Sequence, residues 1–424
     1  MAALINNIDM KKLVNILSCL AVIAMLASCG GKQNKVPNSM VYRPLGDTGL
    51  QVSEISIGCA AFGKLDTAQC RAFMQVALDS GVNYIDIYDP DPIVRSNIGY
   101  ALQGRRDEMI IQGHIGCWWN GDDYERTRDV EKCKIGFEDL LNRLGTDHIE
   151  VGMIHIVDDP NEWDTLVNSP YMEYVKQLKA EGKIQHIGVS SHNVAAALKA
   201  VKSGIVEVIM FSINPAFDRV TADNSVWNPE SFKNMLPGID PMRVEFFDYC
   251  TQHHIGVTNM KTFGGGGRLL DAERSPLGFA LTVDQCNAYV LAKPCVSTSI
   301  CGACTIDELQ ADLHYLHATE AEKDYNTALN NGGNTAKAST GCTYCNHCAP
   351  CPQGIQIAKV NQLLDKAEVA KAQGQPVPDD VKQAYEALDH HASECTHCGS
   401  CVGRCPFSVN VPERMDAAKE IFGK

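Results

Sequence analysis

Short apolar runs alternate with amphipathic stretches from about residue 53 to residue 318. The apolar runs are rich in β-branched residues, which favours strands, and the amphipathic stretches repeat apolar residues at i, i+3 and i+4, which favours helices. Eight runs are predicted to be strands: Ile55–Ala60, Tyr84–Tyr88, Met109–Ile115, Val151–Val157, Ile184–Ser190, Val206–Ile213, Gly256–Lys261 and Val296–Gly302. Helices are predicted between them, for example Thr67–Ser80, Thr127–Leu144, Met172–Glu181, Val194–Lys202, Met242–His253 and Ile306–His317.

This alternation indicates repeated βαβ units and therefore an α/β fold with a parallel sheet. Eight strands that are each followed by a helix close into a (β/α)8 TIM barrel, which we predict over residues 42–318. An open doubly wound sheet is the alternative. That fold would need a G-x-G-x-x-G turn after the first strand. The segment Ser56–Gly63 holds only two glycines, at a different spacing.

Four segments are similar, in sequence and in order, to signatures of the aldo/keto reductase family. They are 42–53 (YRPLGDTGLQVS), 81–86 (GVNYID), 182–190 (GKIQHIGVS) and 261–266 (KTFGGG). The resemblance implies the (β/α)8 barrel. It also implies hydride transfer between NADPH or NADH and a carbonyl or an alcohol, without a metal.

The family uses four catalytic side chains: an Asp, a Tyr five residues later, a Lys on the third strand and a His on the fourth. Asp86 and His155 match this pattern. Asp91 stands at the position of the tyrosine and His114 at that of the lysine, while Tyr88 is the nearest phenol. Two of the four catalytic residues therefore differ from the family.

An aspartate replaces a neutral phenol as an acid only if its pKa is raised strongly. A histidine titrates near neutral pH, so we expect His114 to donate the proton, with His155 orienting the substrate oxygen and Asp86 fixing a tautomer. The catalytic candidates are Asp86, His114, His155 and Tyr88. Three interpretations stay open: altered redox chemistry, ordinary reduction with a displaced acid, and a barrel that only carries electrons or binds.

The resemblance also implies residues that contact NAD(P)H. Serines and an asparagine after the fifth strand correspond to the carboxamide site, and the loop after the seventh strand corresponds to the pyrophosphate site. These candidates are Ser190, Ser191, Asn193, Lys261, Gly264, Gly265 and Arg268. Met210 and Ile213 replace the usual glutamine and tyrosine, so we expect nicotinamide binding to be weak or absent. A merely flexible loop is the alternative for the glycine run.

Nineteen cysteines are far more than a reduced cytosolic enzyme normally carries, and eight of them lie beyond residue 340. They form two runs of four, each closed by Cys-Pro: Cys342, Cys345, Cys348 and Cys351, then Cys395, Cys398, Cys401 and Cys405. Three thiolates at two-residue spacing reach three corners of one cubane, and the cysteine before proline typically serves the other cluster.

We therefore predict two [4Fe–4S] clusters. The first would be held by Cys342, Cys345, Cys348 and Cys405. The second would be held by Cys395, Cys398, Cys401 and Cys351. The last spacer of the first run has two residues instead of three, which weakens the argument for crossed sharing but not that for clusters. A zinc ribbon, with four ligands in two pairs, is the alternative metal site.

Helices are predicted between the cysteine runs, over Ile355–Lys371 and Asp379–His390. With a linker at 319–340 and a cluster domain at 341–424, the chain resembles the ferredoxin-fused branch of the aldo/keto reductases. We expect the tail to pass single electrons to or from the barrel, because hydride transfer alone needs no one-electron relay. The alternative is a non-catalytic electron-transfer or binding subunit with the barrel as its scaffold.

The amino terminus has the pattern of a secretory signal. Two lysines precede an uncharged run at 13–28, which is short for a bilayer span and right for a signal peptide. Leu26–Cys29 resembles a bacterial lipobox, so we expect a signal peptide at 1–28, a lipidated Cys29 and a flexible tether at 29–41. The protein would then be a membrane-anchored lipoprotein, with the periplasmic face as the default. An uncleaved anchor helix is the alternative.

The charge balance restricts the partners. There are 37 Lys and Arg against 51 Asp and Glu, a formal net charge of −14, which repels phosphate backbones and argues against nucleic acid. We expect a small-molecule substrate that the sequence does not identify. A redox partner protein or a quinone-linked donor is the expected electron partner.

Overall fold

The computed structural model describes residues 40–121, 123–332, 342, 348–372, 374–405 and 409–424. The expected signal peptide, the lipidation site Cys29 and the cluster ligand Cys345 lie outside these residues. In the described ranges, no helix combines the length and the apolar character that crossing a membrane requires.

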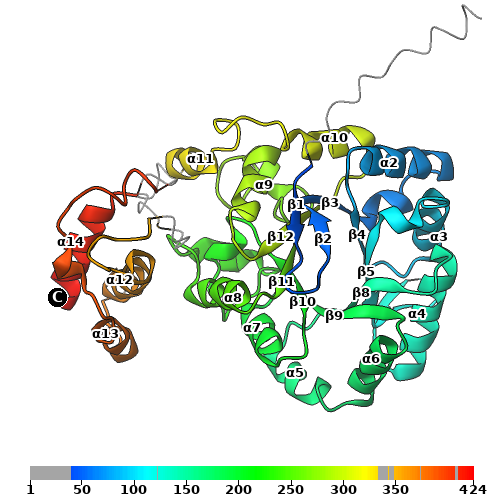
Figure 1. The fold of residues 1–424 in the computed structure, drawn as a ribbon, viewed down its shortest axis with the longest axis horizontal. Coiled ribbons are helices and arrows are strands. Elements are labelled where there is room, and N and C mark those ends of the chain that lie inside the picture. Colours follow the sequence, from blue (N-terminus) through cyan, green and yellow to red (C-terminus); the bar gives the residue numbers. More distant parts are fainter. Residues whose placement is uncertain (1–39, 122, 333–341, 343–347, 373, 406–408) are drawn as a thin grey trace, which may run out of the picture. The chain divides into compact units, whose positions relative to one another are not determined.

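Eight parallel strands close into a barrel at the centre of Figure 1, in the order β10-β11-β12-β3-β4-β5-β8-β9. Their bounds are β3 Ile55–Gly58, β4 Tyr84–Ile87, β5 Ile110–Ile115, β8 Ile149–Ile154, β9 Ile184–Ser191, β10 Val208–Ser212, β11 Gly256–Met260 and β12 Val296–Cys301. The (β/α)8 prediction is confirmed, since a closed barrel excludes the open doubly wound sheet.

Helices surround the strands (Figure 1). They are α2 Thr67–Asp79, α3 Pro92–Ala101, α4 Val130–Leu144, α5 Pro160–Leu166, α6 Pro170–Ala180, α7 Val194–Lys202, α8 Pro241–Gln252, α9 Val283–Leu291 and α10 Ile306–His314. Short 3-10 helices are η2 Cys59–Gly63, η3 Arg106–Glu108, η4 Phe217–Arg219, η5 Pro229–Asn234, η6 Arg268–Leu270 and η7 Ala392–Glu394. Asp66 begins α2 through a capping box with Gln69, which satisfies backbone N–H groups that have no partner within the helix.

One end of the barrel is filled by an amino-terminal hairpin of β1 Tyr42–Pro44 and β2 Gln51–Ser53. Leu45 and Val52 are fully buried and share an apolar cluster with Val151 and Val208, which lie near the beginnings of their strands. The hairpin therefore closes the amino-terminal end of the strands. The carboxyl ends form the mouth, where sites of such barrels lie.

A second hairpin follows β5 and was not predicted. It pairs β6 Cys117–Trp119 with β7 Tyr124–Arg126, antiparallel, so that Trp119 lies opposite Tyr124. The guanidinium of Arg128 donates to the backbone carbonyls of His155 and Ile156, at 2.8 and 2.9 Å. These bonds hold the returning strand against the carboxyl end of β8.

The expected linker at 319–340 needs a correction. Residues 325–332 form α11 (Tyr325–Gly332), which packs on α9 through the rings of Tyr325 and Tyr289, whose centroids are 5.2 Å apart. The side-chain amide of Gln285 also donates to the carbonyl of Asp324, at 3.2 Å. The first part of the span therefore belongs to the barrel unit, and 333–340 lie outside the described residues.

In the described residues of the cysteine-rich module, the α-helices are α12 Ile357–Ala372, α13 Asp379–Glu386 and α14 Val411–Phe422. The first two confirm the predicted helices, although α13 ends four residues before the predicted end at His390. The third was not predicted. Buried apolar side chains from all three form one core, including Leu364, Tyr385 and Met415. This core supports the loops that carry the cysteines.

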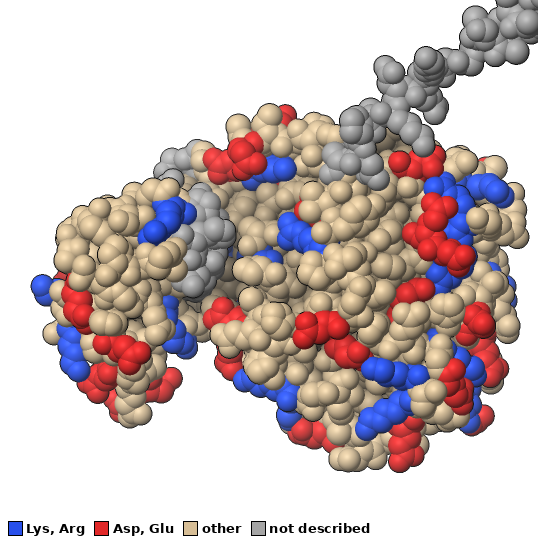
Figure 2. Space-filling view, viewed as in Figure 1, with Lys and Arg blue, Asp and Glu red and all other residues tan. Residues whose placement is uncertain are grey.

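Charged side chains of both signs are interspersed on the barrel face shown in Figure 2. Charged side chains of the barrel also form solvent-accessible pairs, such as Arg105 with Asp79 at 2.8 Å and Lys202 with Glu245 at 2.6 Å. Exposed pairs of this kind contribute little to stability. The exclusion of nucleic acid rests on net charge and stays a prediction.

Candidate functional site

The barrel mouth brings together three of the predicted catalytic residues. Asp86 lies on β4, His114 on β5, and His155 directly after β8. Each is at most 3% exposed. Because neighbouring parallel strands end at the same edge, residues far apart in the sequence meet here.

Four side chains at the mouth form one continuous hydrogen-bonded chain. Oδ1 of Asp86 lies 2.9 Å from Nε2 of His114, and Nδ1 of His114 lies 2.7 Å from Nδ1 of His155. Nε2 of His155 is hydrogen-bonded to the hydroxyl of Tyr124 on β7. Both nitrogens of both imidazoles are therefore used, and the chain runs from a buried carboxylate to a phenol.

A buried glutamine holds the inner end of this chain. Nε2 of Gln112 donates to Oδ1 of Asp86 at 2.6 Å. Its Oε1 accepts from the hydroxyls of Tyr84, at 2.7 Å, and Thr258, at 3.0 Å. Gln112 is thus fixed from two other strands, and it fixes the carboxylate of Asp86 in turn.

Burial sets the protonation states at the outer end. The pKa of His155 is lowered well below its ordinary value, mainly by desolvation and next by the neighbouring His114. This imidazole is therefore neutral. Desolvation raises the pKa of Tyr124, although Arg126 and Arg128 lower it in part. The phenol therefore keeps its proton at neutral pH.

The candidate Tyr88 and the residue at the family's tyrosine position, Asp91, lie outside this hydrogen-bonded chain. Tyr88 is 43% exposed, and desolvation raises the pKa of its phenol. Asp91, at the family's tyrosine position, is the N-cap of α3, where its side chain accepts from the backbone N–H of Ile93 at 2.7 Å. Capping explains why an aspartate stands there, because Asp is among the residues preferred at N-caps.

A metal is the other occupant to consider at the mouth. The ligand atoms of His114, Cys117 and His155 lie within 4.8 Å of one another, and all three side chains are buried. Metal binding needs a thiolate, yet desolvation raises the pKa of Cys117 well above its ordinary value. With the two imidazole nitrogens at hydrogen-bonding distance from each other, the geometry fits a shared proton better than an ion.

The expected carboxamide contacts are partly engaged within the protein. Oγ of Ser190 accepts from the backbone N–H of Ile156 at 2.8 Å, and Oγ of Ser191 donates to the carbonyl of Val157 at 2.7 Å. Asn193 is the N-cap of α7. These polar groups hold the ends of β8 and β9.

The loop after β11 has the backbone expected of an anion-binding loop. Gly264 and Gly265 both adopt positive φ, at 78° and 74°. A Cβ on Gly264 would lie 2.8 Å from Cγ of Leu269, so glycine is required there. Nε of Arg268 donates to the carbonyl of Gly264 at 2.9 Å, and the ammonium of Lys261 lies over the ring of Trp227. Lys261 is a cation suited to a pyrophosphate.

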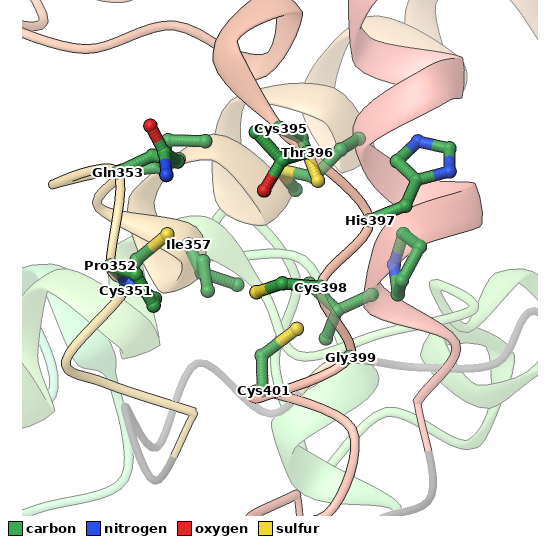
Figure 3. A pocket seen from close by; sticks show the side chains of 14 residues that line it. Cys351, Pro352, Gln353, Ile357, Cys395, Thr396, His397, Cys398, Gly399 and Cys401 are labelled. Atoms are coloured by element: carbon green, nitrogen blue, oxygen red, sulfur yellow. The ribbon is translucent and has the colours of Figure 1, made fainter.

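In the cysteine-rich module, four thiols line one pocket (Figure 3). They are Cys351 from the first run and Cys395, Cys398 and Cys401 from the second. The rest of the wall is largely apolar, including Ile357, Val411 and Met415. Converging thiols in an apolar wall suit a thiolate-bound iron–sulfur cluster. This grouping is the crossed set that the spacing predicted for the second cluster.

The thiols of this pocket differ in their environments. A hydrogen bond between the Cys398 thiol and the hydroxyl of Ser400 lowers the pKa of Cys398, whereas desolvation raises that of Cys401. Nη2 of Arg404 donates to the carbonyls of Cys348 and Pro350, at 2.7 and 2.6 Å, and so ties the two cysteine loops together.

The other predicted ligand set is described only in part. Cys348 is buried in the core of the module, and Cys342 and Cys405 pack against that core. Because Cys345 lies outside the described residues, the structure does not test this set.

The barrel part of the chain is similar in sequence to known proteins. Residues 54–223 match the model of the family described as "Aldo/keto reductase family". The chain is 31% identical over 189 residues to "Uncharacterized oxidoreductase YqkF" of Bacillus subtilis (strain 168), covering 42% of this chain and 58% of that protein. It is 32% identical over 182 residues to "Uncharacterized oxidoreductase YrpG" of the same organism, covering 38% and 54%.

A solved aldo-keto reductase of Bacillus halodurans, in its holo form, is similar with a TM-score of 0.54 and 25% identity, over 68% of this chain and 96% of that one. The chain spans little more than half the length of the two curated relatives above. The cysteine-rich module lies beyond the range that the family model matches.

Proposed function

We propose that the protein is an iron–sulfur oxidoreductase of the aldo/keto reductase type, because residues 54–223 match the model of that family. It would reduce or oxidise a small carbonyl or alcohol at the barrel mouth and exchange single electrons through two [4Fe–4S] clusters. The observation that carries the proposal is the pocket shared by Cys351, Cys395, Cys398 and Cys401.

The residues that would hold the clusters are those assigned from the spacing. The pocket residues would hold one cluster, and Cys342, Cys345, Cys348 and Cys405 the other. When bound, such clusters take up and release electrons one at a time. The protein supplies converging thiolates and an apolar wall that limits solvent access to the pocket.

At the mouth, the chain's own residues bind, orient and protonate. Gln112 fixes Asp86, Asp86 fixes the imidazole of His114, and the neutral His155 sits between His114 and Tyr124. Asp91 is engaged as a helix cap, so we propose that the proton for the substrate oxygen originates at His114 rather than at that position.

NAD(P)H is the hydride donor in this proposal. Lys261 and the glycines at 264 and 265 would hold its pyrophosphate, and the bound cofactor would supply a hydride. Because Ser190, Ser191 and Asn193 already bond to the backbone, we propose that the nicotinamide is held weakly.

The location and the partners are also proposals. A lipid on Cys29 would anchor the protein to a membrane, on the periplasmic face. A redox partner protein or a quinone-linked donor would exchange electrons with the clusters. Mass spectrometry of the wild type and of Cys29→Ala decides the first point, and an unmodified soluble product from both would contradict it.

Iron analysis tests the cluster proposal directly. Anaerobically purified protein is expected to hold about eight irons and eight sulfides per chain and to give an EPR signal after dithionite reduction. Fewer than about six irons would contradict two cubanes, and zinc in their place would favour the zinc ribbon. Cys304→Ser, at a partly exposed cysteine outside the two runs, is the matched control and is expected to keep all the iron.

A non-catalytic electron-transfer or binding subunit is the second candidate, favoured by the loss of the family's tyrosine and lysine. Turnover separates the two functions. Reduction of an acceptor that is lost in Asp86→Ala and in His155→Ala supports the enzyme. Unchanged electron transfer in the double variant supports the scaffold.

A further inference from the structure

We propose that Tyr124 is the group that passes the proton to the substrate oxygen, at the outer end of a relay formed by Asp86, His114, His155 and Tyr124. This inference rests on the proposed oxidoreductase function. The proton donor is then a tyrosine, as in the family, but this tyrosine lies on the hairpin after β5 and not in the segment after β4. His114 then stores the proton instead of delivering it directly.

Exposure identifies the delivering group. Asp86, His114 and His155 are 2 to 3% exposed, whereas Tyr124 is only partly buried. Of the four members of the relay, Tyr124 is therefore the one that a substrate can approach from outside. The inner three are positioned to supply it with a proton.

The hairpin holds Tyr124 in place for this role. The ring of Tyr124 packs edge-on against His155, with centroids 5.6 Å apart and an interplanar angle of 84°. On the same hairpin, Nε of Arg126 donates to the carbonyl of Ile156 at 3.0 Å. With the bonds from Arg128 described above, these contacts tie the hairpin to the backbone at His155. The phenol and the imidazole are therefore held at a fixed spacing.

The hydrogen bonds of the resting relay can all point the same way. The Tyr124 hydroxyl donates to Nε2 of His155, Nδ1–H of His155 donates to Nδ1 of His114, and Nε2–H of His114 donates to the Asp86 carboxylate. Each donor has one acceptor, both imidazoles are neutral, and the net charge is that of one carboxylate. The lowered pKa of His155 agrees with its neutral form.

One added proton prepares the relay for reduction. His114 becomes an imidazolium that donates from Nε2 to Asp86 and from Nδ1 to His155. His155 then carries its proton on Nε2 and donates it to the oxygen of Tyr124. The hydroxyl proton of Tyr124 is thereby released from His155 and turns toward the substrate.

The reaction is the reduction of a carbonyl by a hydride donor of the nicotinamide class. The carbonyl carbon gains the hydride, its π electron pair moves to oxygen, and this oxygen takes the Tyr124 hydroxyl proton. Tyr124 takes the Nε2 proton of His155, and His155 takes the Nδ1 proton of His114 on its own Nδ1. The products are an alcohol and the resting relay, and one proton from solvent restores the loaded state.

The kinetic test is Tyr124→Phe, which removes the hydroxyl and keeps the ring. We expect kcat for reduction to fall by about 10² to 10⁴ with little change in KM, since general acid catalysis contributes that much. Tyr100→Phe, an exposed tyrosine on α3, is the matched control with unchanged kinetics and iron content.

A turnover-independent measurement tests the contact itself. NMR of protein labelled with ¹⁵N-histidine, with oxidised clusters, should show that Tyr124→Phe shifts the ring nitrogens of His155 and that Tyr100→Phe does not. Unshifted His155 signals in Tyr124→Phe would overturn the relay even if no substrate were found. Normal kcat in Tyr124→Phe, or a loss found only in Tyr88→Phe, would also overturn it. A wild type without turnover but with shifted His155 signals would contradict the proposed function and support the relay contact.

Discussion

The two candidate sites of this protein are built in opposite ways. At the barrel mouth, the proposed reacting groups come from β4, β5, β7 and the end of β8, are mostly buried, and are joined by hydrogen bonds. In the cysteine-rich module, four thiols come from two short loops, and they range from buried Cys401 to exposed Cys398. Burial therefore determines the chemistry of the first site, and ligand spacing determines that of the second.

The largest expected effect concerns the thiols that would hold a cluster. Replacing Cys398 and Cys401 together by serine removes two of the four thiols of the pocket, so we expect the loss of about four irons per chain. Iron analysis measures this, with EPR for the remaining cluster. If the double variant kept all its iron, these cysteines would not be ligands.

The second effect concerns a buried acid in the barrel. Asp312 on α10 is 3% exposed, and desolvation raises its pKa to about 8. Its pKa in the unfolded chain is lower, about 4. The folded state therefore binds more protons between these values, and stability falls as pH rises from about 4 to about 8.

The maximum slope for one proton is about 1.4 kcal/mol per pH unit. Urea unfolding at several pH values measures it, and Asp312→Asn, which is neutral at every pH, should remove this part of the dependence. An identical pH dependence in wild type and variant would show that Asp312 titrates normally.

The third effect concerns Gln112 and its buried hydrogen bonds at the inner end of the hydrogen-bonded chain. Gln112→Leu leaves the hydroxyls of Tyr84 and Thr258 without their acceptor, and it removes one of the two donors to Asp86, since His114 remains. Buried polar groups that lose their partners cost about 1–3 kcal/mol each, so we expect a clear loss of stability in urea unfolding. Gln112→Glu keeps an acceptor oxygen for the two hydroxyls but loses the amide donor to Asp86, so it should keep only part of the stability. Equal stability of Gln112→Leu and wild type would show that water replaces these bonds.

The sequence predicted the two regions unequally well, for physical reasons. The eight strands were readable because each is a short buried run rich in β-branched residues, and the pocket of Cys351 with the second cysteine run was readable because ligand spacing is local. Tyr124 was missed because its partner, His155, is chosen by tertiary packing across the mouth. The hairpin that carries it was hidden in a segment where no strand was predicted.

Asp91 shows a signal that was available in the sequence. An aspartate directly before Pro92 is typical of a helix N-terminus, with the cap first and proline at the first helical position. The comparison with the family's tyrosine drew attention to catalysis at this position instead. Removal of a capping residue should lower stability, whereas removal of an acid catalyst should lower kcat.

The smallest expected effect separates these two roles. Asp91→Ala removes the acceptor of the Ile93 backbone N–H, and the loss of an N-cap typically costs about 1 kcal/mol. Asp91→Ser keeps a capping oxygen and should restore most of that stability, measured by urea unfolding. If Asp91 is only a cap, kcat and its pH profile should stay those of the wild type in both variants under conditions where they are folded. A loss of kcat in Asp91→Ser at wild-type stability would instead assign the proton transfer to the position that the family uses, and the relay through Tyr124 would then be unnecessary.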